Sequence, residues 1–116
     1  MLPANARLRK SREFQAVFSK GKSVADSLLV LYTLPRSDES VRFGFSVGRK
    51  IGGAVQRNRV KRLLREAARM LLPEMTPGRD LVIVARVRVK DASFAEVVAS
   101  LGRLLVKSNA SVRSEV

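Results

Sequence analysis

The densest group of residues able to bind a charged ligand lies between Arg49 and Arg69. This stretch holds eight lysines or arginines and one acid, Glu66. Such a density of like charge is costly through self-repulsion unless a polyanion neutralises it, and nucleic-acid phosphate is the common one. Arginine suits phosphate because its planar guanidinium donates to two oxygens at once. The chemistry that these residues predict is phosphate binding.

The spacing of these residues indicates an amphipathic helix from about Ala54 to Leu72. One face carries apolar residues at the helical period, namely Val60, Leu63, Leu64, Ala67, Ala68 and Leu71. The other face presents a basic stripe made of Arg57, Asn58, Arg59, Lys61, Arg62 and Arg65, extended by Arg69. Asn58 adds a neutral donor and acceptor suited to a 2′-hydroxyl or a base edge. A solvated basic face without a partner is the alternative, but such faces usually interleave acids.

A second cationic group precedes the helix. Arg49 and Lys50 lead into the Gly52-Gly53 pair. Glycine lets backbone amides approach phosphate closely, and Gly53 is a possible N-cap.

Aromatic residues form another candidate site nearer the N-terminus. Phe14 and Phe18 lie one helical turn apart, and Tyr32 falls on a predicted strand. Rings close to basic residues suit single-stranded RNA, because bases stack on aromatics with little sequence preference. Packing in the core is the alternative for this spacing. Core positions are predicted for the remaining rings, which are Phe43, Phe45 and Phe94.

Composition narrows the classes of function. The 116 residues carry a net charge of +13 with a pI near 11.6, which favours RNA, DNA or an anionic membrane surface as partner. The chain lacks cysteine and histidine, and with them thiolate chemistry and the usual general base. The carboxylates that could be metal ligands are not grouped in a recognisable metal-binding motif. They are Asp26, Asp38, Glu39, Asp80 and Asp91. We therefore expect neither catalysis by the protein alone nor a bound metal.

The N-terminal half predicts a helix and two strands after a flexible arm over residues 1–8. Ser11 is the expected N-cap and Gly21 the expected left-handed C-cap. Strands are predicted over 27–34 and 41–47, and the polar loop 35–40 between them suggests a hairpin.

The C-terminal half predicts a buried strand within 79–89 and a final helix. Ser93 and Glu96 form a capping box, and apolar spacing continues to about Lys107. Residues 108–116 form a polar tail. The order α-β-β-α-β-α predicts a single α+β domain over residues 1–116.

No apolar run is long enough to span a membrane, no signal peptide is evident, and a cytoplasmic location follows by default.

Several motifs resemble those of one family. Ala54-Val55-x-Arg57-Asn58-x-x-Lys61-Arg62-x-x-Arg65 resembles the signature of the protein subunit of bacterial ribonuclease P. Arg9-Lys10-Ser11-x-x-Phe14-x-x-Val17-Phe18-x-x-Gly21 resembles the family's first helix, and Leu31-Tyr32 its first strand. Gly44-Phe45-Ser46-Val47-x-Arg49-Lys50-Ile51-Gly52 resembles its second strand and the following turn. The similarity covers roughly residues 7 to 107.

The resemblance implies a fold, partners and sites. The family sheet is small and mixed, has four strands, and uses a left-handed β-α-β crossover through the basic helix (ribosomal protein S5 domain 2-like). The basic stripe, with Arg49 and Lys50, would lie against the catalytic RNA. A cleft for the 5′ leader of precursor tRNA would be lined by Phe14, Phe18, Val30 and Tyr32. The RNA would carry the chemistry with Mg²⁺, while the protein binds no cofactor and needs no obligate protein partner.

Two alternatives stay open at the level of the residues. A structural RNA-binding protein of ribosomal type would bind rRNA without leader preference. A DNA-binding protein would place the basic helix in a major groove, although nothing suggests a dimer or half-site spacing. Affinities for duplex DNA and folded RNA at matched salt would separate them.

Overall fold

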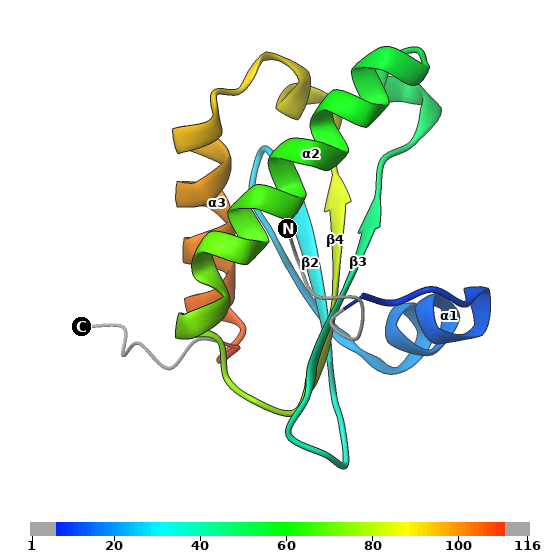
Figure 1. Ribbon diagram of the computed structural model, residues 1–116, viewed down its shortest axis with the longest axis vertical. Coiled ribbons are helices and arrows are strands. Elements are labelled where there is room, and N and C mark those ends of the chain that lie inside the picture. The colour runs from blue at the N-terminus through cyan, green and yellow to red at the C-terminus, as the bar shows by residue number, and fades with distance from the viewer. Residues whose placement is uncertain (1–6, 111–116) are drawn as a thin grey trace.

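The computed structural model describes residues 7–110, which form an α+β domain with three helices and one four-stranded sheet (Figure 1). In chain order the elements are α1 (Ser11–Lys20), β1 (Lys22–Ala25), β2 (Leu29–Pro35), β3 (Val41–Ser46), η2 (Arg49–Ile51), α2 (Ala54–Leu71), η3 (Leu72–Glu74), β4 (Arg79–Ala85), η4 (Val87–Asp91) and α3 (Phe94–Lys107). The predicted α+β class is confirmed. Most of the predicted arm and tail, residues 1–6 and 111–116, lies outside the described residues.

The described parts of the arm and tail are docked on the domain, contrary to prediction. The Leu8 N–H donates to the Phe43 carbonyl, and the Leu8 side chain is buried. At the other end, the Thr76 N–H donates to the carbonyl of the buried Ala110. Apolar side chains in segments that look polar overall account for both contacts.

The predicted hairpin is wrong, because β4 lies between β2 and β3. The strand order is β1-β2-β4-β3; β4 pairs antiparallel with β2 and parallel with β3. The apolar run of β4 needs burial on both faces, which the centre of the sheet provides. The loop after β2 bridges the start of β4, where the Arg36 N–H donates to the Gly78 carbonyl.

The connection from β3 through α2 to β4 has the unusual hand that the resemblance implied. In Figure 1 the arrows of β3 and β4 point upward, α2 lies in front of them, and β4 lies to the left of β3. This geometry is a left-handed crossover, whereas right-handed ones strongly predominate in proteins.

The two faces of the sheet are covered unequally. Leu29 and Leu31 of β2 and Leu81 and Ile83 of β4 point toward α2 and α3, within a core of nineteen buried residues. The opposite face carries α1 and a cluster of three buried residues, Leu8, Val17 and Val82. The sheet is therefore closed on one side and partly open on the other.

The fourth strand of the sheet was not placed from the sequence. β1 is a four-residue edge strand whose side chains are mostly exposed, so no apolar alternation marks it. β4 lies within the predicted range 79–89, and the residues after it, Val87–Asp91, form the 3₁₀ turn η4.

Both predicted ends of α1 are wrong, whereas the predicted capping box of α3 is confirmed. In α3 the Ser93–Glu96 capping box forms as predicted. In α1 the N-cap is Lys10, because Glu13 reaches back to the backbone N–H groups of Arg9 and Lys10. Gly21 is extended, at φ −78°; an added Cβ would lie 2.6 Å from the Thr33 carbonyl oxygen, so close packing on β2 requires the glycine.

Among the described residues, no helix has both the length and the apolar character needed to cross a bilayer.

Candidate nucleic-acid interface

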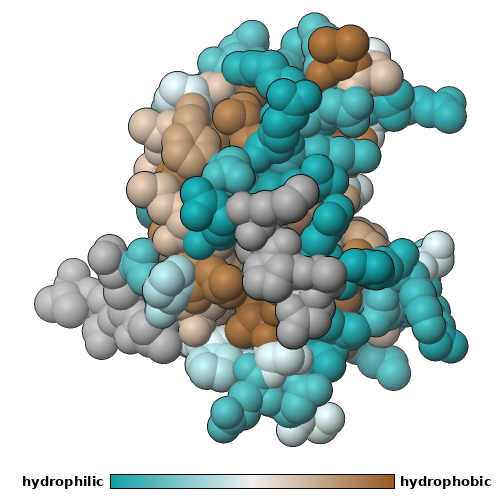
Figure 2. All heavy atoms as spheres, in the orientation of Figure 1, coloured by the Kyte–Doolittle hydropathy of each residue, from teal (hydrophilic) through white to brown (hydrophobic). Residues whose placement is uncertain are grey.

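Helix α2 presents the basic stripe outward because its apolar face is pinned to the core. Val60, Leu64, Ala67, Ala68 and Leu71 are buried, as predicted, and Leu63 is half-buried. The helix begins after Gly53, which is the predicted N-cap but offers no side-chain acceptor. Figure 2 shows hydrophilic surface over α2 beside more hydrophobic surface over α3.

The members of the basic stripe differ in how freely they can bind a ligand. The side chains of Asn58 and Arg62 are exposed and make no hydrogen bond or ion pair within residues 7–110. Arg69 pairs with Glu66 at 3.0 Å, and Arg59 donates to the Lys90 carbonyl at 3.3 Å. The side chains at the centre of the stripe are therefore those that have no partner within the described residues.

Two further members are half-buried. The Nε atoms of Arg57 and Arg65 are shielded from solvent and have no hydrogen-bond partner in the described structure. This shielding of the side-chain stems limits the directions that the two guanidinium groups can take. Lys61 is also half-buried.

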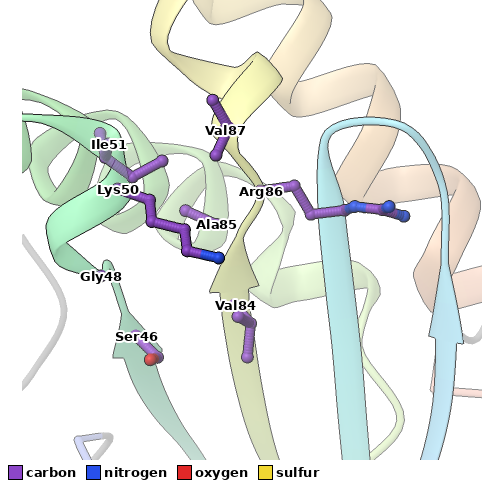
Figure 3. Close-up of a pocket in the computed structure, with 8 residues that line it drawn as sticks. All are labelled: Ser46, Gly48, Lys50, Ile51, Val84, Ala85, Arg86 and Val87. Atoms are coloured by element: carbon purple, nitrogen blue, oxygen red, sulfur yellow. The ribbon is translucent and has the colours of Figure 1, made fainter.

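Arg49 and Lys50 are on η2, between the end of β3 and the start of α2. Both are exposed. Lys50 borders an open pocket of about 470 Å³ at the ends of β3 and β4. The pocket is lined by Ser46, Gly48, Lys50, Ile51, Val84, Ala85, Arg86 and Val87 (Figure 3). In Figure 3 Lys50 extends between the two strand ends, whereas Arg86 turns away from the pocket.

The predicted aromatic residues gather on the open face of the sheet. Phe14 lies on Gly44, where an added Cβ would be 2.4 Å from the ring carbon Cε1. Phe18 remains 38% exposed, and its ring meets Tyr32 edge-on, with centroids 4.9 Å apart. Val30 shares the sheet face of Tyr32 and is half-buried. We call Phe14, Phe18, Val30 and Tyr32 the aromatic surface.

The sequence left two interpretations of these rings, RNA stacking and packing in the core, and packing accounts for only part of the group. Val17 is the buried residue of α1, and Phe14 is half-buried beside it, so packing explains them in part. Packing does not account for the exposure of Phe18. The core assignment is confirmed for Phe43 and fits the partly buried Phe45, but it is wrong for Phe94, which is 38% exposed at the first residue of α3.

The structure adds Val84 and Ser46 as neighbours of Val30, which the resemblance had assigned to the leader cleft. Val30, Val84 and Ser46 are successive partners across β2, β4 and β3, so they form one row on the open face. This row connects the aromatic surface to the pocket near Lys50. Val84 sits inside an apolar run that the sequence marks only as buried, so the strand order was needed to place it.

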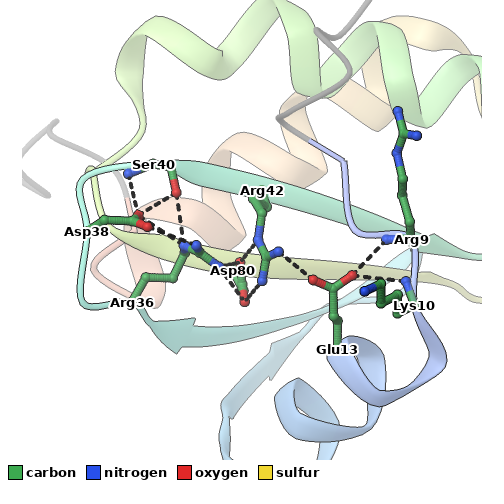
Figure 4. Close-up of polar contacts among 8 residues, drawn as sticks. All are labelled: Arg9, Lys10, Glu13, Arg36, Asp38, Ser40, Arg42 and Asp80. Atoms are coloured by element: carbon green, nitrogen blue, oxygen red, sulfur yellow. Dashed lines mark hydrogen bonds and ion pairs between the residues drawn. The ribbon is translucent and has the colours of Figure 1, made fainter.

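The carboxylates serve as structural partners. Arg42 makes a bidentate ion pair with Asp80, at 2.9 Å for both contacts, and its remaining nitrogen contacts Glu13 (Figure 4). Arg36 joins Asp80 to Asp38. Asp26 accepts from the backbone of Leu28 and Leu29. Within the described part of the chain, no group of three or more potential ligands could hold a metal.

Hydrogen bonding lowers the pKa of Glu13 from 4.5 to about 2. The N–H of Lys10 has the largest effect, that of Arg9 the next, and the Arg42 guanidinium adds to both. Glu13 is therefore ionised throughout the neutral range.

Comparisons with known proteins identify the family to which the chain belongs. The sequence model of the family described as Ribonuclease P matches residues 2–109. The ribonuclease P protein component of Shouchella clausii is 45% identical over 103 residues, covering 88% of this chain and 84% of the relative. That of Clostridioides difficile is 41% identical over 106 residues, covering 90% and 93%.

Solved structures of the family share the fold. The RNase P protein of Staphylococcus aureus superposes with a TM-score of 0.84 at 32% identity, covering 91% of this chain and 97% of that one. The Thermotoga maritima protein gives 0.79 at 32% identity, covering 85% and 94%. The chain therefore belongs to the ribonuclease P protein family, and is a subunit, working with the RNase P RNA, of the ribonucleoprotein endonuclease that processes tRNA 5′ ends.

Proposed function

We propose that the protein uses its two surfaces for two different RNAs. The basic stripe, together with Arg49 and Lys50, binds the catalytic RNA, and the aromatic surface binds the 5′ leader of precursor tRNA. The observation that carries this proposal is their placement: the stripe lies on the closed side of the sheet, and the aromatic surface on the open side. Both RNAs can then be held at once.

The chemistry of the stripe suits a folded RNA. Arg62 and Asn58 project from a helix that the core holds in place, so their backbone positions are set before binding. The planar guanidinium of arginine loses less entropy per hydrogen bond to phosphate than a flexible ammonium does. Each phosphate neutralised releases counterions, so binding should weaken with salt.

The chemistry of the aromatic surface suits a single strand. Phe18 offers an exposed ring beside Tyr32, and Val30 and Val84 extend an apolar strip toward the pocket. Bases of the leader can stack on the rings along this strip. A leader in extended conformation fits this sequence of contacts better than a duplex does, because unstacked bases are exposed only in single strands.

The protein contributes positioning and charge neutralisation to catalysis. With no histidine or cysteine in the sequence, and with Glu13, Asp38 and Asp80 held in ion pairs, its side chains supply no evident general base. We propose that Mg²⁺ in the holoenzyme is bound through the RNA, and that the protein stabilises the RNA–substrate complex by its charge. The proposed place of action is the cytoplasm.

The test is cleavage of precursor tRNA at low Mg²⁺ by a bacterial ribonuclease P RNA, with and without this protein. We expect the protein to stimulate cleavage and to favour precursor over mature tRNA in binding. An RNA that is active alone at high Mg²⁺ but gains nothing from the folded protein would contradict the proposal.

A further inference from the structure

Side chains on the open face of the sheet form three rows that run across the strands. The first row contains Leu34, Asp80 and Arg42 from β2, β4 and β3; the second contains Tyr32, Val82 and Gly44; the third contains Val30, Val84 and Ser46. These rows give a scale on which the position of α1 can be described.

Helix α1 lies along the second row. Phe14 rests on Gly44, Val17 is buried with Val82, and Phe18 meets Tyr32. The third row is left half-exposed and borders the pocket. A shift of α1 by one row would cover Val30 and Val84 and separate Phe18 from Tyr32.

Apolar contacts alone fix this position weakly. The buried cluster on this face has three members, and valine side chains line both the second and third rows. Hydrophobic contact is non-directional, so it distinguishes poorly between neighbouring apolar rows. A directional contact is needed to select one row.

The directional contact comes from the first row. Asp80, 6% exposed, holds Arg42 in a bidentate pair, and Arg36 donates to the same carboxylate at 3.1 Å. Arg42 is thereby fixed on the sheet, with one nitrogen left to contact Glu13 in the first turn of α1 (Figure 4). Glu13 also accepts from the backbone of Arg9 and Lys10, so it joins the start of the helix to the anchored guanidinium.

We propose that Arg42 and Asp80 are positioning residues that act through Glu13. They hold α1 over the second row, so that Phe18 stays beside Tyr32 and the third row stays open to an extended single strand. The effect on RNA rests on the proposed leader-binding function, but the effect on α1 does not.

The position of α1 can be followed without RNA. Tyr32 is the single tyrosine of a chain without tryptophan, so tyrosine near-UV circular dichroism and Tyr32 ring-proton shifts report on its contact with Phe18. The variants are Arg42→Gln and Glu13→Gln. Arg42→Gln leaves Asp80 paired with Arg36, and Glu13→Gln changes a half-exposed side chain, so both should fold.

Glu96→Gln is the matched control. Glu96 occupies the same capping-box position in α3 as Glu13 does in α1, but it makes no contact with the open face. Loss of a capping box alone would affect Glu13→Gln and Glu96→Gln but not Arg42→Gln, which leaves the Glu13 capping bonds in place. The positioning effect is instead shared by Arg42→Gln and Glu13→Gln.

We expect Arg42→Gln and Glu13→Gln to lose the near-UV circular dichroism of Tyr32, which we call the Tyr32 signal, together with its Phe18-induced ring-proton shifts. Far-UV circular dichroism should show that both variants are folded. Glu96→Gln should keep the Tyr32 signal. In the holoenzyme, preference for precursor over mature tRNA should fall about five-fold or more, the lower bound for losing one base stack. An unchanged Tyr32 signal in both folded variants would overturn the proposal. A lost signal with unchanged preference would uphold the positioning and contradict leader binding at the aromatic surface.

Discussion

The two faces of the sheet are covered to different extents by the helices packed on them. On the closed face, α2 and α3 bury a large apolar core and leave the basic stripe outside it. On the open face, α1 buries little, leaves Phe18 exposed and depends on ion pairs for its placement. The more deeply packed face carries charges on a helix held in place by the core, and the less packed face carries a surface that can accommodate a flexible strand.

The largest expected effect comes from breaking the closed face. Leu64→Ala should destabilise the protein by about 2–5 kcal/mol, because Leu64 is completely buried and a cavity would remain. Urea denaturation followed by far-UV circular dichroism measures the change. A cost below about 1 kcal/mol would mean that the core does not depend on α2 as described.

A smaller effect should follow from crowding the open face. Gly44→Ala places a Cβ 2.4 Å from the Phe14 ring, so α1 must shift. We expect a cost of about 1–3 kcal/mol, typical of overpacking, together with a changed Tyr32 near-UV signal. Gly102→Ala is the control, because a Cβ there meets nothing within 4 Å. Equal stability of the two variants would contradict the close packing of Phe14 on Gly44.

The third effect concerns affinity at the basic stripe. Arg62→Ala should weaken binding to the catalytic RNA and reduce the slope of log K against log salt by about one phosphate contact. Arg69→Ala, which removes a side chain already paired with Glu66, should change that slope less. Titrations at several salt concentrations would show this, and identical slopes for wild type and Arg62→Ala would count against the stripe as an RNA site.

The smallest effect is a dependence on acid. The folded-state pKa of Glu13, about 2, lies below the ordinary value of 4.5. Its contribution is therefore present above pH 4.5 and is lost as the pH falls toward 2. Within that window we expect the Tyr32 signal to weaken in the wild-type protein. The same titration of Glu13→Gln should lack this step, and an identical step in both would assign it to other carboxylates.

The sequence predicted the closed face better than the open one. The helical period of α2 identified Val60, Leu64 and Leu71 as its buried side, because a long periodic segment carries its own signal. The capping box of α3 was equally local. Charge density then located the basic stripe without knowledge of the fold.

The open face depends on contacts between distant segments, which sequence patterns do not contain. The position of β4 between β2 and β3 brings Val84 beside Val30, and the hairpin prediction missed this order. Asp80 looked like an isolated acid, yet it binds Arg36 and Arg42 from two other segments. The exposed edge strand β1 lacked an apolar pattern altogether.

The most direct test of the division between the two faces compares Phe18→Ala with Arg62→Ala in the reconstituted holoenzyme. The measured quantity is the ratio of affinities for precursor and mature tRNA, with each protein at saturating concentration over the RNA. We predict that Phe18→Ala lowers this ratio about five-fold or more. Arg62→Ala should leave the ratio unchanged and raise only the protein concentration needed for assembly. An unchanged ratio for Phe18→Ala, or equal falls for both variants, would contradict the assignment of one RNA to each face.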